Sequence, residues 1–192
     1  MKTIVILMAL MIPVSSCSRK DSTTPEGAGS EWETLNQEAM NLLRAGKYDR
    51  AVVVAKKALK VAEKNVGPNH PDVATSLNNL AELYRSKGKY AEAEPLYKRA
   101  LAILEKSLGP DHPYVATSLN NLARLYQDQG KYAVAEPLYK RSLVILEKSL
   151  GPDHPNVAMS LENLAALYRA TKRDEEAEVL EKRAAGIRAV RK

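Results

Sequence analysis

Residues 67–108 of this 192-residue chain are repeated almost letter for letter as residues 109–150. The two copies follow one another directly and differ at only nine positions. Duplication this close predicts one unit of local structure stacked on itself, in which each copy buries the apolar face that its neighbour leaves open.

The repeat frame extends beyond these two copies. The tripeptide Gly-Lys-Tyr at 88–90 recurs at 46–48, so an eroded first copy covers about residues 31–66. Moving the frame forward gives a last copy at 151–192, in which Lys172 and Asp174 stand where the earlier copies have Gly and Tyr. We therefore expect one domain over residues 31–192, built from four similar units.

Each unit has the pattern of a helix pair. In the copy at 67–108, Leu77, Leu80, Ala81 and Tyr84 have the i, i+3, i+4, i+7 spacing of one helix face. Gly88 then offers the positive φ that a helix C-terminus favours. A second apolar stripe follows and consists of Ala93, Leu96, Tyr97, Ala100 and Leu104.

Prolines and glycines predict where the helices begin and end. In the Gly-Pro-Asp-His-Pro segments at 109–113 and 151–155, we expect glycine to close the long second helix and the second proline to open the next first helix. Pro95 and Pro137 are expected in the first turns of their helices, where a missing N–H matters least.

The N-terminal residues predict export and lipidation. Lys2 and the apolar run at 4–14 have the features of a secretory signal at residues 1–16, which is too short to cross a bilayer. The following Val-Ser-Ser-Cys at 14–17 resembles the lipobox of bacterial lipoproteins, which implies cleavage before Cys17 and acylation of its thiol. The alternative is an ordinary signal peptidase cut that leaves the chain's single cysteine as a free thiol.

The segment after Cys17 is expected to connect this anchor to the repeats. Residues 17–30 are polar, contain Pro25 and two glycines, and show no apolar period, which predicts a flexible tether. Ser18 occupies the place of the aspartate that marks inner-membrane retention in some bacteria, so the resemblance favours an outer-membrane lipoprotein of the bacterial cell envelope that faces the periplasm.

The net charge of +6 does not indicate a nucleic-acid partner. The copy at 67–108 carries six bases and five acids, so the excess is spread thinly, and no aromatic residues accompany a basic cluster. We interpret these charges as solvated helix faces.

The repeat resembles the tetratricopeptide repeat, in the 42-residue variety of kinesin light chains and their bacterial relatives. The match covers residues 31–192 and rests on the small and large positions of the two best copies. These positions are Leu77, Leu80, Ala81, Tyr84, Gly88, Tyr90, Ala93, Tyr97 and Ala100, followed by Leu119, Leu122, Ala123, Tyr126, Gly130, Tyr132, Ala135, Tyr139 and Ser142. The first copy departs from the pattern at Glu38 and Ala55. The resemblance implies an all-α fold, a right-handed superhelical solenoid of stacked antiparallel helix pairs.

The same resemblance implies that the first helices line a concave groove for a peptide or a partner's helix. The residues off the apolar stripe would face it: Gln37, Thr75, Asn78, Asn79, Glu82, Arg85, Thr117, Asn120, Asn121, Arg124, Gln127, Glu162, Asn163 and Arg169. Among these, Gln37, Asn79, Asn121 and Asn163 occupy the same position in successive copies and form a ladder of amides. An amide both donates to and accepts from a peptide backbone. The alternative is that these amides bond their own loops or neighbouring helices, or face solvent.

No chemistry beyond binding is indicated. His70, His112 and His154 occupy the same turn in successive copies, too far apart to share a metal ion, and we assign them to stabilising that turn. The sequence contains no nucleophile elbow, phosphate-binding glycine loop, paired catalytic carboxylates or Cys/His cluster. We therefore expect no enzyme activity, no cofactor and no metal.

Two functions remain open from the sequence. The first is a non-catalytic adaptor that is membrane-anchored through Cys17 and binds a protein or extended peptide, with no nucleic acid. The second is a scaffold that assembles with itself through the ends of the solenoid, for which Ile187 and Val190 would supply exposed apolar surface.

Overall fold

The computed structural model describes residues 28–189 and contains eight α-helices and no strand within that range. The helices are α1 (Ala28–Arg44), α2 (Tyr48–Val66), α3 (Pro71–Ser86), α4 (Tyr90–Leu108), α5 (Pro113–Asp128), α6 (Tyr132–Leu150), α7 (Pro155–Ala170) and α8 (Asp174–Ala189). The predicted signal, Cys17 and most of the predicted tether lie outside the described residues. The helix α1 begins three residues earlier than the repeat frame indicated.

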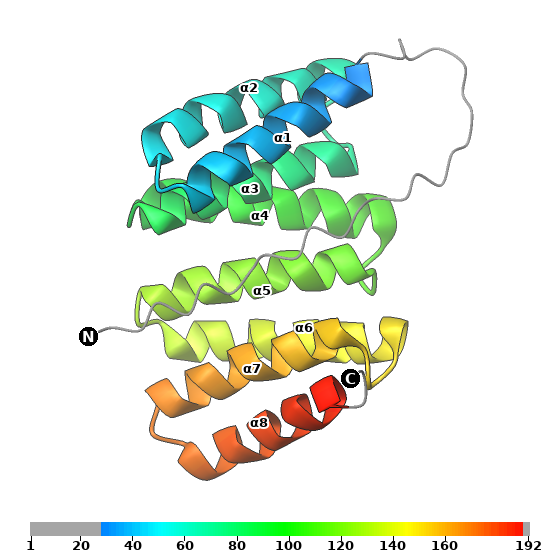
Figure 1. The fold of residues 1–192 in the computed structure, drawn as a ribbon. Helices are drawn as coiled ribbons and strands as arrows, with labels where there is room; N and C mark the ends of the chain where they lie inside the picture. The colour runs from blue at the N-terminus through cyan, green and yellow to red at the C-terminus, as the bar shows by residue number, and fades with distance from the viewer. Residues whose placement is uncertain (1–27, 190–192) are drawn as a thin grey trace.

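The helices form four antiparallel pairs stacked in one direction, as Figure 1 shows. Each helix packs on its neighbours in the chain, and α3, α5 and α7 begin at the same proline of successive copies, Pro71, Pro113 and Pro155. The all-α solenoid predicted from the repeat is therefore confirmed. None of the helices in the described range is long and apolar enough to cross a membrane.

Glycine ends the first helix of a pair as predicted. In the turn after α3, Gly88 has φ 71°, its N–H donates to the carbonyl of Arg85 (2.9 Å), and the N–H of Lys89 donates to the carbonyl of Tyr84 (2.8 Å). These two bonds make a Schellman motif, which satisfies carbonyls that the helix itself leaves free. In the last repeat Lys172 takes this position with φ 60°, the one positive φ outside glycine in the described part of the chain.

The histidines cap the first helices, which confirms their role in the turn. The Nδ1 atom of His112 accepts a hydrogen bond from the N–H of Tyr114 (3.1 Å), and Pro113 is the first residue of α5. His70 and His154 cap α3 and α7 in the same way. Each imidazole thus binds one of the N–H groups that a helix N-terminus leaves unpaired.

The prediction for Pro95 and Pro137 was wrong by one turn. Because α4 begins at Tyr90 and α6 at Tyr132, both prolines lie inside the second turn of their helices. There a proline lacks the N–H that would bond the carbonyl four residues earlier.

The core runs along the stack between the two layers of helices. Fully buried Tyr97 and Tyr139 fill it from the second helices, and Leu77, Leu119 and Leu161 fill it from the first. Alanines in α2, α4, α6 and α8 allow the helix backbones to approach closely.

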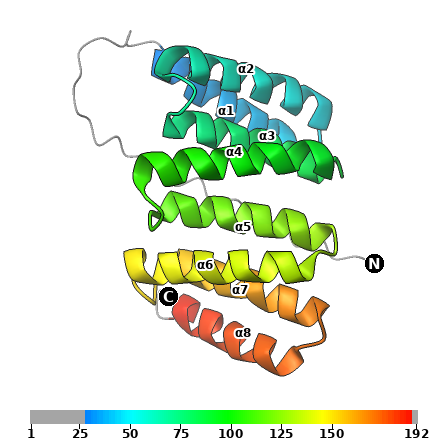
Figure 2. The same ribbon diagram turned by 180° about the vertical axis from the view of Figure 1, so that it is seen from behind.

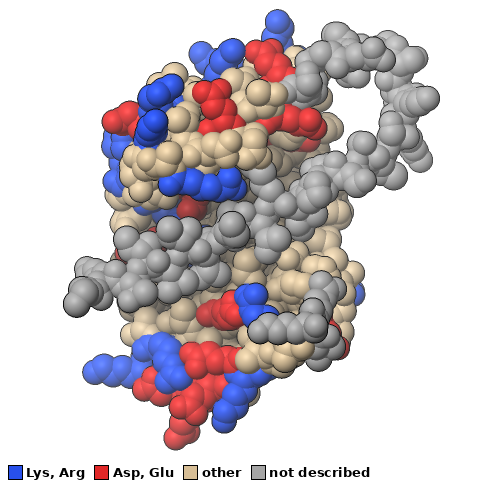
Figure 3. Space-filling model, in the orientation of Figure 1, with Lys and Arg blue, Asp and Glu red and all other residues tan. Residues whose placement is uncertain are grey.

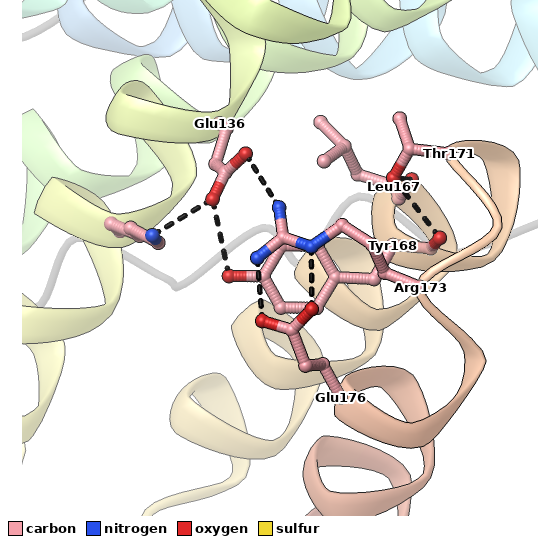
Figure 4. A network of polar contacts seen from close by, with 7 residues as sticks. Glu136, Leu167, Tyr168, Thr171, Arg173 and Glu176 are labelled. Carbon is pink, nitrogen blue, oxygen red and sulfur yellow. Dashed lines mark hydrogen bonds and ion pairs between the residues drawn. The ribbon is translucent and has the colours of Figure 1, made fainter.

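Ion pairs link successive second helices across the outside of the stack. Arg99 binds Glu63 (2.7 Å), Arg141 binds Glu105 (2.7 Å), and the same pair recurs between α8 and α6. The last repeat adds the network of Figure 4, in which Arg173 binds Glu136 of α6 (2.9 Å) and lies 3.8 Å from the centre of the Tyr168 ring. Exposed pairs of this kind contribute about 0–1 kcal/mol each, so packing of apolar side chains supplies most of the stability.

Candidate functional site

The first helices of the four pairs form one side of the stack. Their backbones approach one another closely from α1 to α3, α3 to α5 and α5 to α7. Within residues 28–189, successive second helices show no such close backbone approach, and ion pairs bridge them. A stack whose helices approach more closely on one side curves toward that side. The side made by α1, α3, α5 and α7, which we call the inner face, is viewed in Figure 1, and the second helices are in front in Figure 2. All the residues predicted to face the groove belong to these four first helices.

The four amides of the predicted ladder differ in their partners. Gln37 donates to Asn41 on its own helix (3.0 Å), and Asn79 donates to Asn36 of α1 (2.9 Å). Asn121 and Asn163 make no side-chain hydrogen bond to any described residue and are half-buried. Two members of the ladder therefore stabilise the fold, and two are available to a ligand.

The neighbouring asparagines serve the packing of the stack. Asn78 accepts a hydrogen bond from Ser118 of the next repeat (3.3 Å). Asn120 is only 5 % exposed and donates to Ser142 (2.7 Å), whose hydroxyl donates to a backbone carbonyl of α5. The structure thus corrects the prediction for Asn120, which points inward because Ser142 replaces the alanine of the previous copy and offers it a hydroxyl.

The charged pair on α3 is neutralised within the protein. Arg85 binds both carboxylate oxygens of Glu82 (2.6 and 2.9 Å) and also pairs with Asp128 of α5. Tyr97 donates a further hydrogen bond to Glu82 (2.8 Å). Burial alone would raise the pKa of Glu82, but the hydrogen bonds and charge of Arg85, followed by the charge of Arg124, lower it below its ordinary range. Arg85 has little charge left for a ligand.

The two charged residues predicted on α7 are also paired. Arg169 binds Glu181 (2.9 Å) and Asp174 (3.0 Å), and Glu162 binds Arg188 (2.7 Å). Figure 3, drawn from the same side as Figure 1, shows Lys and Arg beside Asp and Glu at both ends of the stack. Arg169 and Glu162 therefore fasten α8 to α7.

Hydroxyl and amide groups at three further predicted positions have partners as well. Thr75 and Thr117 donate to the carbonyls of Pro71 and Pro113 one turn earlier. Gln127 accepts a hydrogen bond from Tyr139 (2.9 Å). These bonds satisfy the three groups within the protein, so we assign them a secondary role in recognising a ligand.

Arg124 is the exception among the inner-face arginines. It lies on α5, in the middle of the stack, and forms no ion pair or hydrogen bond with the residues that the structure describes. Burial raises the pKa of Tyr139, and the charge of Arg124 opposes part of that rise, so the guanidinium lies near this phenol. On the helix surface, Asn121 is one turn from Arg124, at a spacing that brings side chains together. These two residues and Asn163 of α7 make up the unpaired set.

The sequence reasoning missed Asn36 and Asp128. Their bonds to Asn79 and Arg85 determine that these two predicted residues already have partners. Asn36 holds in the first copy the position that Asn78 holds in the second, so sliding the repeat frame would have found it. No comparable signal marked Asp128, because it replaces Ser86 of the previous copy and its partner lies on another helix.

Comparison with known protein families decides the assignment. A family model described as tetratricopeptide repeat matches residues 33–106, 74–148 and 125–189. The chain belongs to the tetratricopeptide repeat family. Membership of this generally non-catalytic family indicates a protein-interaction scaffold.

Two solved structures resemble this one closely. BtubC (BKLC) from P. vanneervenii has a TM-score of 0.72 and 30 % sequence identity, over 83 % of this chain and 63 % of that one. A putative kinesin light chain with nearly identical repeats from Podosopora anserina has a TM-score of 0.72 and 28 % identity, over 86 % of this chain and 77 % of that one. The kinesin-light-chain-like type predicted from the length of the repeat is supported.

A curated relative is similar over a shorter stretch. The RxLR effector protein SFI4 of Phytophthora infestans (strain T30-4) is 36 % identical over 55 residues. That match covers 29 % of this chain and 16 % of the effector, so the tetratricopeptide repeat chain spans a small part of that relative's length.

The tetratricopeptide repeat stack has polar surfaces at both ends. On α1, the exposed residues Glu31 and Glu38 stand where α3 buries Val73 and Leu80. On α8, the exposed residues Glu181 and Arg188 stand where α6 buries its counterparts Tyr139 and Leu146. Ile187, predicted to be exposed, is only 5 % exposed and belongs to the core, and Val190 lies outside the described residues.

The described residues contain no group of His, Cys, Asp and Glu side chains that could hold a metal ion. Each histidine is occupied at the start of its own helix, as described above. Among the predicted groove residues, those without a partner in the described part of the chain therefore offer two amides and one positive charge.

Proposed function

We propose that the chain is a scaffold that binds an extended segment of a partner protein along its inner face, centred on α5 and α7. The observation that carries this proposal is the unpaired set Asn121, Arg124 and Asn163 on a face where every other predicted polar side chain has a partner inside the protein. A buried or half-buried polar group without a partner is costly unless water or a ligand satisfies it.

The chemistry of the set suits a peptide with an acidic group. Each amide can donate to a backbone carbonyl and accept from a backbone N–H, so Asn121 and Asn163 can hold an extended chain without selecting its side chains. The guanidinium of Arg124 can bind a carboxylate through two hydrogen bonds. One carboxylate, from Asp, Glu or a C-terminus, would thus set the register of the segment.

The proposal includes the membrane anchor expected from the sequence. Acyl chains on Cys17 would hold the protein at the bacterial outer membrane, with the inner face open to partners in the periplasm. This part rests on the lipobox resemblance alone, and mass spectrometry of the protein from its native host, showing an acylated N-terminal Cys17, is its test.

Self-assembly through the ends receives no support from the structure. Charged residues occupy the terminal positions that are apolar inside the stack, and Ile187 is buried. The adaptor is therefore the function that we propose.

A photo-cross-linking experiment in the native host tests the adaptor. A benzophenone amino acid is placed at Asn121 on the inner face or, as the matched control, at Val144, which is 61 % exposed on α6. We expect a defined partner to be cross-linked from position 121 and not from position 144. Equal yields from both positions would contradict a site on the inner face.

The partner found in this way then allows a test of the residues. We expect Arg124→Gln and Asn121→Ala/Asn163→Ala each to weaken binding about tenfold or more, because hydrogen bonds to a charged group contribute about 1.5–3 kcal/mol and neutral ones about 1 kcal/mol. Melting temperature should change little, since these side chains make no hydrogen bond or ion pair with the described residues of the free protein. Asn79→Ala is the control: its amide bonds Asn36, so stability should fall while binding changes little. Unchanged affinity in both variants would refute the assigned residues.

A further inference from the structure

The solvent face of α2 carries a cluster of positive charges that the equivalent faces of α4 and α6 do not have. Arg50, Lys56, Lys60 and Lys64 are exposed, and none of them pairs with a described residue. They lie within about a third of the helix circumference, opposite the alanines that α2 buries. We call these four residues the α2 basic face.

Comparison with α4 shows how this face arises. Lys56 is the counterpart of Lys98, but Lys98 is neutralised by Glu94 one turn earlier (2.7 Å), where α2 has Val52. The same Glu–Lys pair recurs in α6. The first repeat thus keeps the lysine and lacks its acid.

Two further replacements add charge at the same place. Arg50 stands where α4 has Glu92, and Lys60 stands where α4 has Ala102. The charges of the copy at 67–108 predicted a thinly spread excess of bases. The structure shows that this prediction does not hold for the first repeat.

The α2 basic face lies beside the point where the described chain begins. The pair α1–α2 is antiparallel, and Glu31 at the start of α1 binds Lys57 of α2 (3.2 Å). In Figures 1 and 2, the start of α1 lies at the end of the stack that α2 occupies. The eleven residues 17–27 span at most about 40 Å when fully extended, so an anchor at Cys17 would keep this end of the stack close to the bilayer.

We propose that the α2 basic face docks on an anionic phospholipid surface. This inference rests on the membrane anchoring proposed above, and it makes the face the second, electrostatic contact that stable anchoring commonly needs. Lysine and arginine side chains near such a surface are attracted to its phosphates, and the attraction weakens with salt. Val53, 68 % exposed among these cations, would meet the headgroup region. Docking here leaves the inner face of α5 and α7 free for a partner.

Vesicle sedimentation tests the proposal with the full chain carrying Cys17→Ser, so that no acyl chain contributes. Neutral phosphatidylcholine vesicles are compared with vesicles that also contain phosphatidylglycerol. The test variant is Lys60→Glu/Lys64→Glu, and the control is Lys106→Glu/Lys182→Glu, which changes the net charge equally at exposed lysines of α4 and α8 that have no ion pair among the described residues. All chains share the same N-terminal residues, so any contribution from these is constant.

We expect the parent chain to bind anionic vesicles about tenfold or more tightly than neutral ones, with the preference lost in high salt. The affinity of the α2 variant for anionic vesicles should fall about tenfold, and that of the control should stay within about twofold of the parent. Equal losses in both variants would overturn the proposal, because net charge alone would then explain binding. Binding of the parent to a DNA duplex, but not to anionic vesicles, would overturn it in favour of nucleic acid.

The vesicle assay and the test for acylation of Cys17 give independent results. Acylation of Cys17 is read by mass spectrometry, whereas the vesicle assay uses a chain that cannot be acylated. A chain that is not acylated in its host but shows the expected vesicle preference would refute the anchor and leave the basic face established as a lipid-binding surface.

Discussion

At the scale of single residues, the His112 cap gives the fold a sensitivity to acid. His112 accepts its capping bond at Nδ1, and a protonated imidazole has no lone pair there. Burial lowers the pKa of His112 from its ordinary value of 6.5, so the folded state favours the neutral ring. The stability that this group contributes is complete above about pH 6.5 and is lost as the pH falls through its lower folded-state value. We therefore predict that the free energy of unfolding falls between pH 7.5 and 5.

The substitution His112→Asn isolates this contribution, because the asparagine side chain accepts the same bond and does not titrate. Its unfolding free energy should depend less on pH than that of the parent, whereas His112→Ala should lose about 1 kcal/mol at pH 7.5 through loss of the cap. Urea unfolding followed by circular dichroism measures both. Parallel pH profiles for parent and His112→Asn would show that the cap is not the titrating group.

The asparagines show why letters alone could not assign the binding residues. Asn79, Asn121 and Asn163 occupy one repeat position, but each depends on an asparagine of the preceding first helix. Asn36 accepts from Asn79, whereas Asn78 accepts from Ser118 instead. Asn120, the potential partner of Asn163, donates to Ser142 instead. Asparagines at one repeat position therefore differ in their partners. For Asn120 the cause is one substitution on a neighbouring helix, Ser142 in place of Ala100, and only the structure shows which bond forms.

At the scale of elements, the turn between α7 and α8 departs from the other three. Lys172 has φ 60°, while its counterparts Gly46, Gly88 and Gly130 have φ 69–71°. An L side chain in this region costs about 1 kcal/mol, and glycine avoids that cost. We predict that Lys172→Gly raises the free energy of unfolding by about 0.5–1 kcal/mol, which corresponds to a melting temperature higher by roughly 2–3 °C for a chain of this length.

The reverse change at the matched position is the control. A Cβ atom at Gly130 would meet nothing within 4 Å, so Gly130→Lys tests backbone conformation without a clash and should lower stability by about 1 kcal/mol. Arg173, next in the chain, remains held by Glu136 and the Tyr168 ring in Figure 4, so the turn keeps its position. Thermal unfolding of both variants measures these changes in stability. A destabilised Lys172→Gly protein would show that the lysine side chain contributes more than its backbone strain costs.

Helix limits were largely predictable because glycine, histidine and proline mark them locally. The prediction for Pro95, which was wrong by one turn, shows the limit of such signals. The start of α4 depends on the Schellman turn after Gly88, which lets the second helix begin at Tyr90. Pro95 therefore lies in the second turn of α4, and no local pattern of residues indicates that position.

At the scale of the whole molecule, a near-perfect repeat predicted the architecture but not its surfaces. Stacking follows from duplication, because identical units offer identical apolar faces. Charge distribution follows instead from the positions where copies differ, such as Arg50 and Lys60 of the first copy. These differences indicated a charged surface only when the structure showed that Arg50 and Lys60 have no acidic partner among the described residues.

The two ends of the stack lead to a prediction about assembly. Because Glu181 and Arg188 replace the buried Tyr139 and Leu146 of α6, α8 lacks the apolar face onto which another repeat would dock. We predict that the Cys17→Ser chain sediments as a monomer at micromolar concentrations. We also predict that Glu181→Tyr/Arg188→Leu, which restores the interior pattern, self-associates as concentration rises, since exposed apolar surface drives such contacts. Sedimentation velocity over a concentration series distinguishes the two, and a double variant at α4, Lys98→Tyr/Lys106→Leu, controls for added hydrophobicity away from the ends. A parent chain that already forms defined oligomers, unaffected by these substitutions, would show that assembly uses a surface other than the end of the solenoid.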